Sequence, residues 1–157
     1  MNGLNQFLLA VLICIIVACF FQADASGNAL YQGTFTGKVI GDRDTSAPLT
    51  LELTQNGDAV TGTATIGGGV GIDTGGFICP GFVAVPSGMI GVNGTVSSND
   101  PRHLEAKSSL SASGLTITAN VLADVSSDGS TMNVQLDLNI PWPCQSTTLK
   151  ATLTRSN

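Results

Sequence analysis

The sequence predicts an all-β protein whose fold is an antiparallel up-and-down β-barrel of eight or nine short strands. Apolar residues recur at every second position over most of the chain, which is the period of a half-buried strand. Clusters of Gly, Asn, Asp, Ser and Pro separate these runs and predict turns between them. The 3.6-residue period of an amphipathic helix is nearly absent. Together these observations predict consecutive antiparallel strands.

The first strand is expected at 31–40, and the clearest hairpin follows at 48–66. Its first arm alternates polar residues with Leu49, Leu51 and Leu53, and its second arm repeats the alternation. The Asn56-Gly57-Asp58 turn joins the two arms, and Asn-Gly is a strong hairpin signal because both residues tolerate positive φ. One face of both arms is therefore expected to point into the protein.

The later strands are expected at 90–97, 104–110, 115–125, 132–140 and 148–153, and a short run at 78–85 would make the ninth. Short turns join them in sequence. Closing such a sheet into a barrel removes its exposed edges, which favours the barrel. A two-sheet β-sandwich is the alternative that the same pattern allows.

Residues 1–25 are expected to be a signal peptide, followed by a single β-barrel domain at 26–157. The apolar run Phe7–Phe21 is shorter than the roughly 20 residues that a membrane-spanning helix needs. Small residues at Ala23 and Ala25 fit cleavage before the next residue. Lipidation at Cys19 or an uncleaved anchor are the alternatives. Each places the domain outside the cytoplasm: secreted, periplasmic or lipid-anchored to the cell envelope.

Two of the four cysteines lie in this leader, which leaves Cys79 and Cys144 as a pair. We expect them to form a disulfide, worth about 4 kcal/mol because it closes a long loop. The chain has no Cys-x-x-Cys motif and no zinc-finger spacing. No metal site and no cofactor are expected.

The charges exclude some classes of function. Six Lys and Arg against eleven Asp and Glu give a net charge of −5, and the basic residues are scattered singly, so nucleic-acid binding is not expected. His103 is the only histidine and follows a turn signal, with no identifiable base partner. Glu52 and Glu105 fall at outward strand positions and do not form an acid–base pair. No catalytic residue is therefore assigned, and an enzymatic role is left open but not favoured.

One motif suggests an enzyme. Ile72-Asp73-Thr74-Gly75 resembles the active-site triplet of aspartic proteases. A single copy would require a homodimer, because the chemistry needs two aspartates that share a proton. The motif lies in a glycine-rich loop, where aspartate is commonly a turn residue that accepts backbone hydrogen bonds. A homodimeric aspartic protease using Asp73 is therefore kept as an alternative.

The hairpin at 48–66 resembles a segment of small secreted bacterial β-barrels, and its Thr61-Gly62-Thr63 is similar to a strand motif of avidin-type barrels. The resemblance implies a calycin-type barrel, avidin-like or lipocalin-like, that binds small apolar or mixed ligands inside. No binding residue carries over. Trp142 is the only tryptophan, whereas avidin-type biotin sites use several, and the lipocalin Gly-x-Trp signature is missing near the first strand.

The expected function is non-covalent binding of a small apolar or amphipathic ligand, or of another protein. The expected contact residues are Phe77, Phe82 and Val83, in the long irregular stretch after residue 66, together with Phe35. A carrier would have a cavity lined by Phe35, Leu51, Ile117 and Leu136. A structural or surface interaction protein would have a filled core instead, which the scarcity of inward aromatic residues favours.

Overall fold

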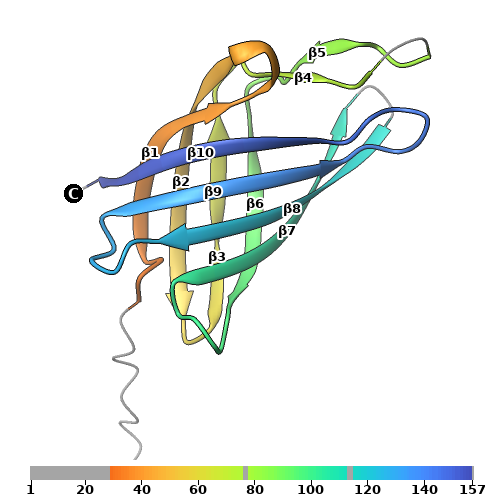
Figure 1. Cartoon of the computed structure of the whole chain (residues 1–157). Helices are drawn as coiled ribbons and strands as arrows, with labels where there is room; N and C mark the ends of the chain where they lie inside the picture. The colour runs from red at the N-terminus through yellow and green to blue at the C-terminus, as the bar shows by residue number, and fades with distance from the viewer. Residues whose placement is uncertain (1–28, 76–77, 113–114, 157) are drawn as a thin grey trace, which may run out of the picture.

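The computed structural model describes residues 29–75, 78–112 and 115–156, which form a closed antiparallel barrel of eight strands (Figure 1). The strand order around the barrel is β1-β10-β9-β8-β7-β6-β3-β2, with β2 next to β1. The up-and-down barrel is confirmed, and the two-sheet sandwich is wrong. The barrel strands are β1 (Gly33–Ile40), β2 (Ser46–Asn56), β3 (Ala59–Ile66), β6 (Gly88–Val96), β7 (His103–Ala112), β8 (Leu115–Val125), β9 (Thr131–Asn139) and β10 (Thr147–Ser156).

Between β3 and β6 the chain leaves the barrel and forms the β4–β5 insertion. β4 (Gly71–Asp73) pairs with β5 (Phe82–Ala84) as a separate two-stranded sheet beside one end of the barrel (Figure 1). The strand expected at 78–85 is thus β5, but it is shorter and adds no ninth strand to the barrel. Proline on both sides, at Pro80 and Pro86, limits its length because proline cannot donate to a strand ladder.

The alternation of the sequence places the core as expected. Leu49, Leu51 and Leu53 of β2 are all buried, and β9 buries Met132 and Val134 in the same way. Each strand thus turns its apolar face inward and its polar face to solvent, which is the pattern that closes a barrel around side chains. A short 3-10 turn, η1 (Asp42–Asp44), joins β1 to β2.

One end of the barrel, which we call the closed end, is sealed by three side chains. Tyr31 and Phe35 have no solvent exposure. The Tyr31 hydroxyl lies 3.0 Å from the carbonyl oxygen of Ala123 and also contacts the carbonyl of Arg102. The Arg155 guanidinium stacks 4.6 Å from the centre of the Phe35 ring. It also donates hydrogen bonds to the carbonyl oxygens of Leu30, Gln32 and Gly129. We call Tyr31, Phe35 and Arg155 the plug.

The opposite end, which we call the disulfide end, carries the β4–β5 insertion and the loop 140–146. A disulfide joins Cys79 of the insertion to Cys144 of that loop, with 5.6 Å between the Cα atoms. The backbone N–H of Gln145 donates to the carbonyl oxygen of Thr74 at 2.8 Å, which adds a second link between the same two segments. The predicted disulfide is therefore present, and it indicates an oxidising environment.

The expected signal peptide at 1–25, its expected cleavage site after Ala25, the alternative lipid site Cys19 and the expected contact residue Phe77 lie outside the described residues. Within the described part of the chain, no helix has the length and apolar character needed to cross a membrane.

Candidate functional site: the barrel cavity and the β6–β7 seam

The barrel contains an apolar cavity of about 190 Å³ between the plug and the disulfide end. All eight barrel strands contribute to its wall, and Ile72 of the β4–β5 insertion covers it at the disulfide end. Buried wall residues such as Leu51 and Ala119 retain 7–8% exposure, whereas Tyr31 and Phe35 of the plug have none. The plug thus fills the closed end, and the cavity extends from Leu53 and Met132 near the plug toward the disulfide end.

The structure therefore differs from the expectation of a filled core. The physical reason is that four inward positions of the cavity wall are occupied by alanine: Ala64, Ala106, Ala119 and Ala123. Their methyl groups are too short to reach across the barrel. Of the residues expected to line a cavity, Leu51, Ile117 and Leu136 do so. Phe35 lies in the plug instead, because its position along β1 is close to the closed end.

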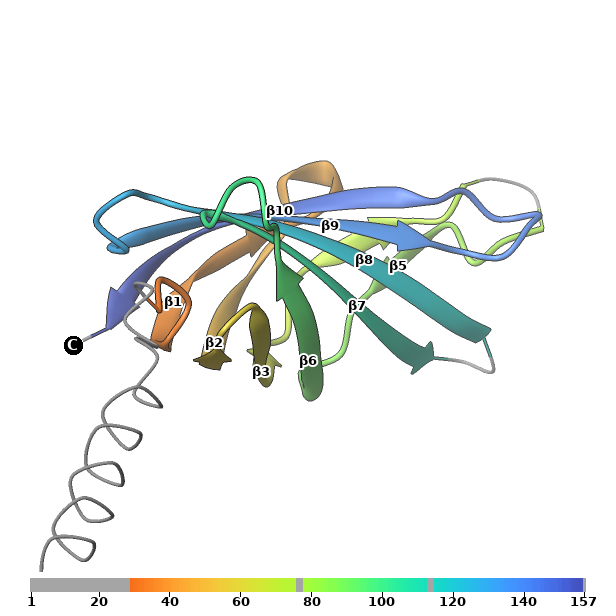
Figure 2. The same ribbon diagram turned by 90° about the horizontal axis from the view of Figure 1, so that it is seen from below.

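The strand ladder is incomplete between β6 and β7, and we call this gap the β6–β7 seam. β3 and β6 pair over eight residues and β7 and β8 over ten, but β6 and β7 pair only between 93–96 and 104–107. Beyond this ladder the two strands run in different directions (Figures 1 and 2). Among the described residues, one hydrogen bond crosses the seam, from the Ser108 hydroxyl to the Gly91 carbonyl oxygen at 3.4 Å.

The same residues form the cavity wall and the outer surface at the seam. A groove on the outside shares five residues with the cavity, Met89, Ile90, Lys107, Ser108 and Ser109. The polar residues that border the cavity within the described chain also lie at the seam or just before β6. They are Ser87, Lys107, Ser108 and Ser109, and Lys107 is the only charged one. The cavity is thus apolar throughout except along this seam.

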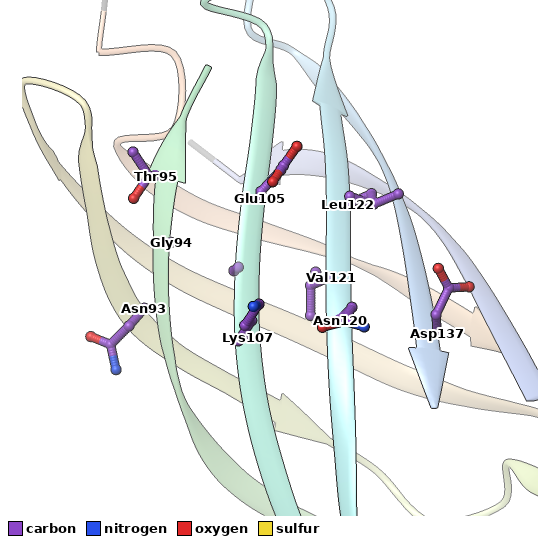
Figure 3. Close-up of a pocket in the computed structure, with 10 residues that line it drawn as sticks. Asn93, Gly94, Thr95, Glu105, Lys107, Asn120, Val121, Leu122 and Asp137 are labelled. Carbon is purple, nitrogen blue, oxygen red and sulfur yellow. The ribbon is translucent and has the colours of Figure 1, made fainter. Parts of the chain in front are cut away.

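Lys107 lies at the last pair of the ladder, on the outer face of the barrel. Its register partners are Asn93 on β6 and Asn120 on β8, and all three side chains border the hollow shown in Figure 3. Glu105 and Asp137 border the same hollow. No carboxylate of the described chain lies within ion-pair distance of the Lys107 ammonium, although several other basic side chains have such partners. The ammonium is therefore available to an anion at the seam.

Sequence analysis missed this seam, although one signal was present. The inward positions of β7 begin with Leu104 and Ala106, and the next is Ser108, where the alternation calls for an apolar residue. Two glycines on β6, Gly88 and Gly91, give no side chain to the other side of the seam. The sequence signal of the β6–β7 seam is therefore a serine at an inward position opposite a glycine-rich strand.

The expected contact residues at the disulfide end hold the β4–β5 insertion on the barrel. Val83 packs against the core, whereas Phe82 is 37% exposed. The Phe82 ring covers Gly71 so closely that a Cβ there would lie 2.1 Å from the ring. The Arg43 guanidinium lies 4.8 Å from the centre of the same ring. Val83 and Phe82 therefore both help to hold the β4–β5 insertion in place at the disulfide end of the barrel.

Asp73, the residue of the protease-like motif, is engaged in turn contacts. Its carboxylate accepts a hydrogen bond from Arg43 at 2.7 Å and one from the backbone N–H of Gly75 at 3.1 Å. The Arg43 bond, followed by the Gly75 bond, lowers the pKa of the carboxyl group. An aspartic dyad needs a carboxyl group that retains a shared proton, so this environment disfavours that chemistry.

The other groups considered as candidate acids or bases, His103, Glu52 and Glu105, lie near the surface. His103 Nδ1 lies 2.8 Å from Asp124 Oδ1, and this hydrogen bond raises the pKa of the imidazole. Glu52 and Glu105 both point outward, as predicted. The described residues contain no cluster of three or more His, Cys, Asp or Glu side chains that could hold a metal ion.

Comparison with known proteins supports the fold. A scan against protein-family models and a search of curated proteins both find no match. Among solved structures, a redesigned β-barrel, mFAP1, bound to DFHBI, has a TM-score of 0.53 and 14% identity, over 80% of this chain and 95% of that chain. EF1p2_mFAP2b bound to DFHBI has a TM-score of 0.52 and 12% identity, over 81% of this chain and 94% of that one. A third redesigned barrel, b11L5F_LGL, has a TM-score of 0.51 and 14% identity, over 82% of this chain and 93% of its own. At such low identity the likeness establishes the architecture alone, an eight-strand up-and-down β-barrel.

Proposed function

We propose that this protein is an exported barrel that binds a small apolar or amphipathic molecule non-covalently in its cavity. The observation that carries the proposal is the apolar cavity of about 190 Å³, whose polar bordering residues lie on one side, at the β6–β7 seam and just before β6. Ligand sites in proteins commonly combine an apolar lining with a few polar groups that orient the ligand. The expected relationship to calycin-type barrels agrees with this role. Export agrees with the disulfide between Cys79 and Cys144.

The size of the cavity limits the ligand. A dry protein cavity of about 150 Å³ is large enough to hold benzene. A cavity of about 190 Å³ therefore suits roughly six to eight carbon atoms. Two similar solved barrels, mFAP1 and EF1p2_mFAP2b, are bound to the small molecule DFHBI, which supports the idea that this architecture can accept a small ligand.

Isothermal titration calorimetry of the oxidised protein with 1-octanol tests the proposal. Binding should be saturable, with one site per barrel. Ala119→Leu should abolish it, because Ala119 is on the cavity wall. Thr118→Leu is the matched control, since the neighbouring position on β8 faces solvent. If octanol does not bind, or binds Ala119→Leu as well as it binds the unmodified protein, the cavity is not a ligand site.

Contact with another protein is a second candidate function. The two loops joined by the disulfide carry the most exposed apolar side chains among the described residues, Ile78 at 77% and Trp142 at 90%. Exposed apolar side chains that lie close together are common at interaction sites. Sedimentation velocity over a range of concentrations tests the simplest partner, a second copy. Self-association that Trp142→Ser removes would support this function, and a monomer at all concentrations would argue against self-association.

A further inference from the structure

We propose that the ligand enters the barrel sideways through the β6–β7 seam, and that Lys107 at the seam binds an anionic head group. The ligand class is then an anionic amphiphile with one short apolar tail, such as a medium-chain carboxylate. This inference rests on the proposed function, since the tail would occupy the same cavity. It adds the route of entry and the charge of the ligand, which the cavity alone does not give.

Both ends of the barrel are less suitable as an entrance. The plug fills the closed end, with Tyr31 and Phe35 fully buried. At the disulfide end the β4–β5 insertion covers the cavity and is fixed by several contacts. Besides the disulfide, the N–H of Gly71 donates to the Thr45 hydroxyl at 2.8 Å, and the N–H of Asp73 donates to the Asp42 carboxylate at 2.6 Å. Opening that end would break these contacts together.

The seam needs far less disruption. No ladder joins 88–92 of β6 to 108–112 of β7, so a ligand can separate the strands without breaking backbone pairing there. Segments with few backbone contacts open at low free-energy cost. The one hydrogen bond that crosses the seam among the described side chains, from the Ser108 hydroxyl to the Gly91 carbonyl oxygen, has a length of 3.4 Å. Both the cavity and the outer groove reach this segment of the wall.

The seam also provides the chemistry for an anion. A tail in the cavity would leave its head group at the seam, beside the Lys107 ammonium and the hydroxyl groups of Ser108 and Ser109. Ammonium and hydroxyl groups both donate hydrogen bonds, and bonds to a charged acceptor are the stronger ones. Glu105 and Asp137 border the hollow on the outer face and would repel an anion that lies there. Lys107 also borders the separate groove that contains Ser108 and Ser109, which neither Glu105 nor Asp137 lines, so a head group in that groove contacts Lys107 away from both carboxylates.

The head group is tested by comparing octanoate with 1-octanol, which has the same number of carbon atoms but no charge. Octanoate should bind on the order of tenfold more tightly. Lys107→Met should reduce octanoate affinity to about that of octanol and leave octanol binding unchanged. Lys150→Met is the matched control, because Lys150 is an exposed lysine on β10. If octanol binds as tightly as octanoate, or Lys107→Met does not weaken octanoate binding, the head-group assignment is wrong although the cavity still binds ligand.

The route of entry is tested at two glycines of the same strand. Gly88 pairs with Ile66 and therefore faces inward, whereas Gly91 pairs with Thr63 and faces outward. A Cβ at either position meets no atom within 4 Å, so both accept a larger side chain. Gly88→Leu places that side chain at the inner side of the seam, and Gly91→Leu is the control.

Stopped-flow or NMR exchange measurements with octanoate separate blocked entry from lost volume. Gly88→Leu should slow association and dissociation together, each by at least about tenfold, because a narrower entrance affects both directions. A decrease in affinity with unchanged association would show that the side chain only occupies the cavity, and would refute entry at this seam. Failure of both octanoate and octanol to bind the unmodified protein would instead refute the proposed function itself.

Discussion

Replacing Ala119 with leucine should stabilise the barrel, because the added carbon atoms enter a cavity and not a packed core. Ala119 lies on the cavity wall and keeps 7% exposure. Leucine adds three carbons, and each buried methylene group contributes about 0.8 kcal/mol. Ordering the new side chain costs about 0.5–1 kcal/mol. The net gain in the free energy of unfolding should therefore be about 1.5 kcal/mol.

Urea denaturation of the oxidised protein measures this gain. For a change of that size the midpoint should rise by roughly 0.5–1 M urea with an unchanged slope. Thermal unfolding should shift upward by roughly 5 °C. The same variant should lose octanol binding, so stability and binding change in opposite directions, as expected when a functional cavity is filled.

Ala47→Leu is the control. Ala47 is also a buried alanine, with 1% exposure, but it does not line the cavity. Added carbons at a packed position force neighbouring side chains out of their preferred conformations, which costs about 1–3 kcal/mol. If Ala119→Leu destabilises the protein as Ala47→Leu does, the interior has no free volume at that position. The reasoning from the cavity would then be refuted.

Three further predictions concern the two ends of the barrel. Replacing both Cys79 and Cys144 with serine should lower the free energy of unfolding by about 4 kcal/mol, because their disulfide closes a loop with a sequence separation of 65; a loss below about 1 kcal/mol in urea denaturation would contradict this. Tyr31→Phe should cost about 1 kcal/mol, since it removes the buried hydrogen bond from the hydroxyl to the Ala123 carbonyl oxygen; unchanged stability would show that the hydroxyl contributes nothing to the plug. His103 has a raised pKa in the folded state, with its bond to Asp124 as the main cause. Its stabilising contribution should therefore be complete below the unfolded pKa of about 6.5 and disappear as the pH rises through the folded pKa. The difference in melting temperature between the unmodified protein and His103→Gln, measured from pH 5 to 9, should shrink with increasing pH, and a constant difference would rule out this linkage.

The walls of the barrel could be predicted because they depend on local pattern. The alternation at Leu49, Leu51 and Leu53 and the turn at 56–58 determine which face points inward and where the chain reverses. Pairing with the next strand in the chain then follows with little further information. The disulfide could be predicted from the sequence as well, since only two of the four cysteines lie outside the expected signal peptide.

The ends of the barrel and the seam could not be predicted, because they depend on contacts between distant residues. The period of two shows that Phe35 points inward but not how far along the barrel it lies. Its burial depends on Arg155, which stacks on its ring from the opposite end of the chain. The seam depends on the point at which β6 and β7 diverge, and strand twist, which sequence alternation does not report, determines that point.

The ladder between β1 and β10 has a consequence for how the protein is made. These two strands pair over seven residues, and they are the first and the last strands of the barrel. During synthesis the backbone of β1 has no partner on this side until residues 147–156 leave the ribosome, and β9 likewise lacks its second neighbour. Both are then open edges of the kind that pairs with other chains. Any version of the chain that ends before β10 should therefore aggregate, however many of the other seven barrel strands it retains.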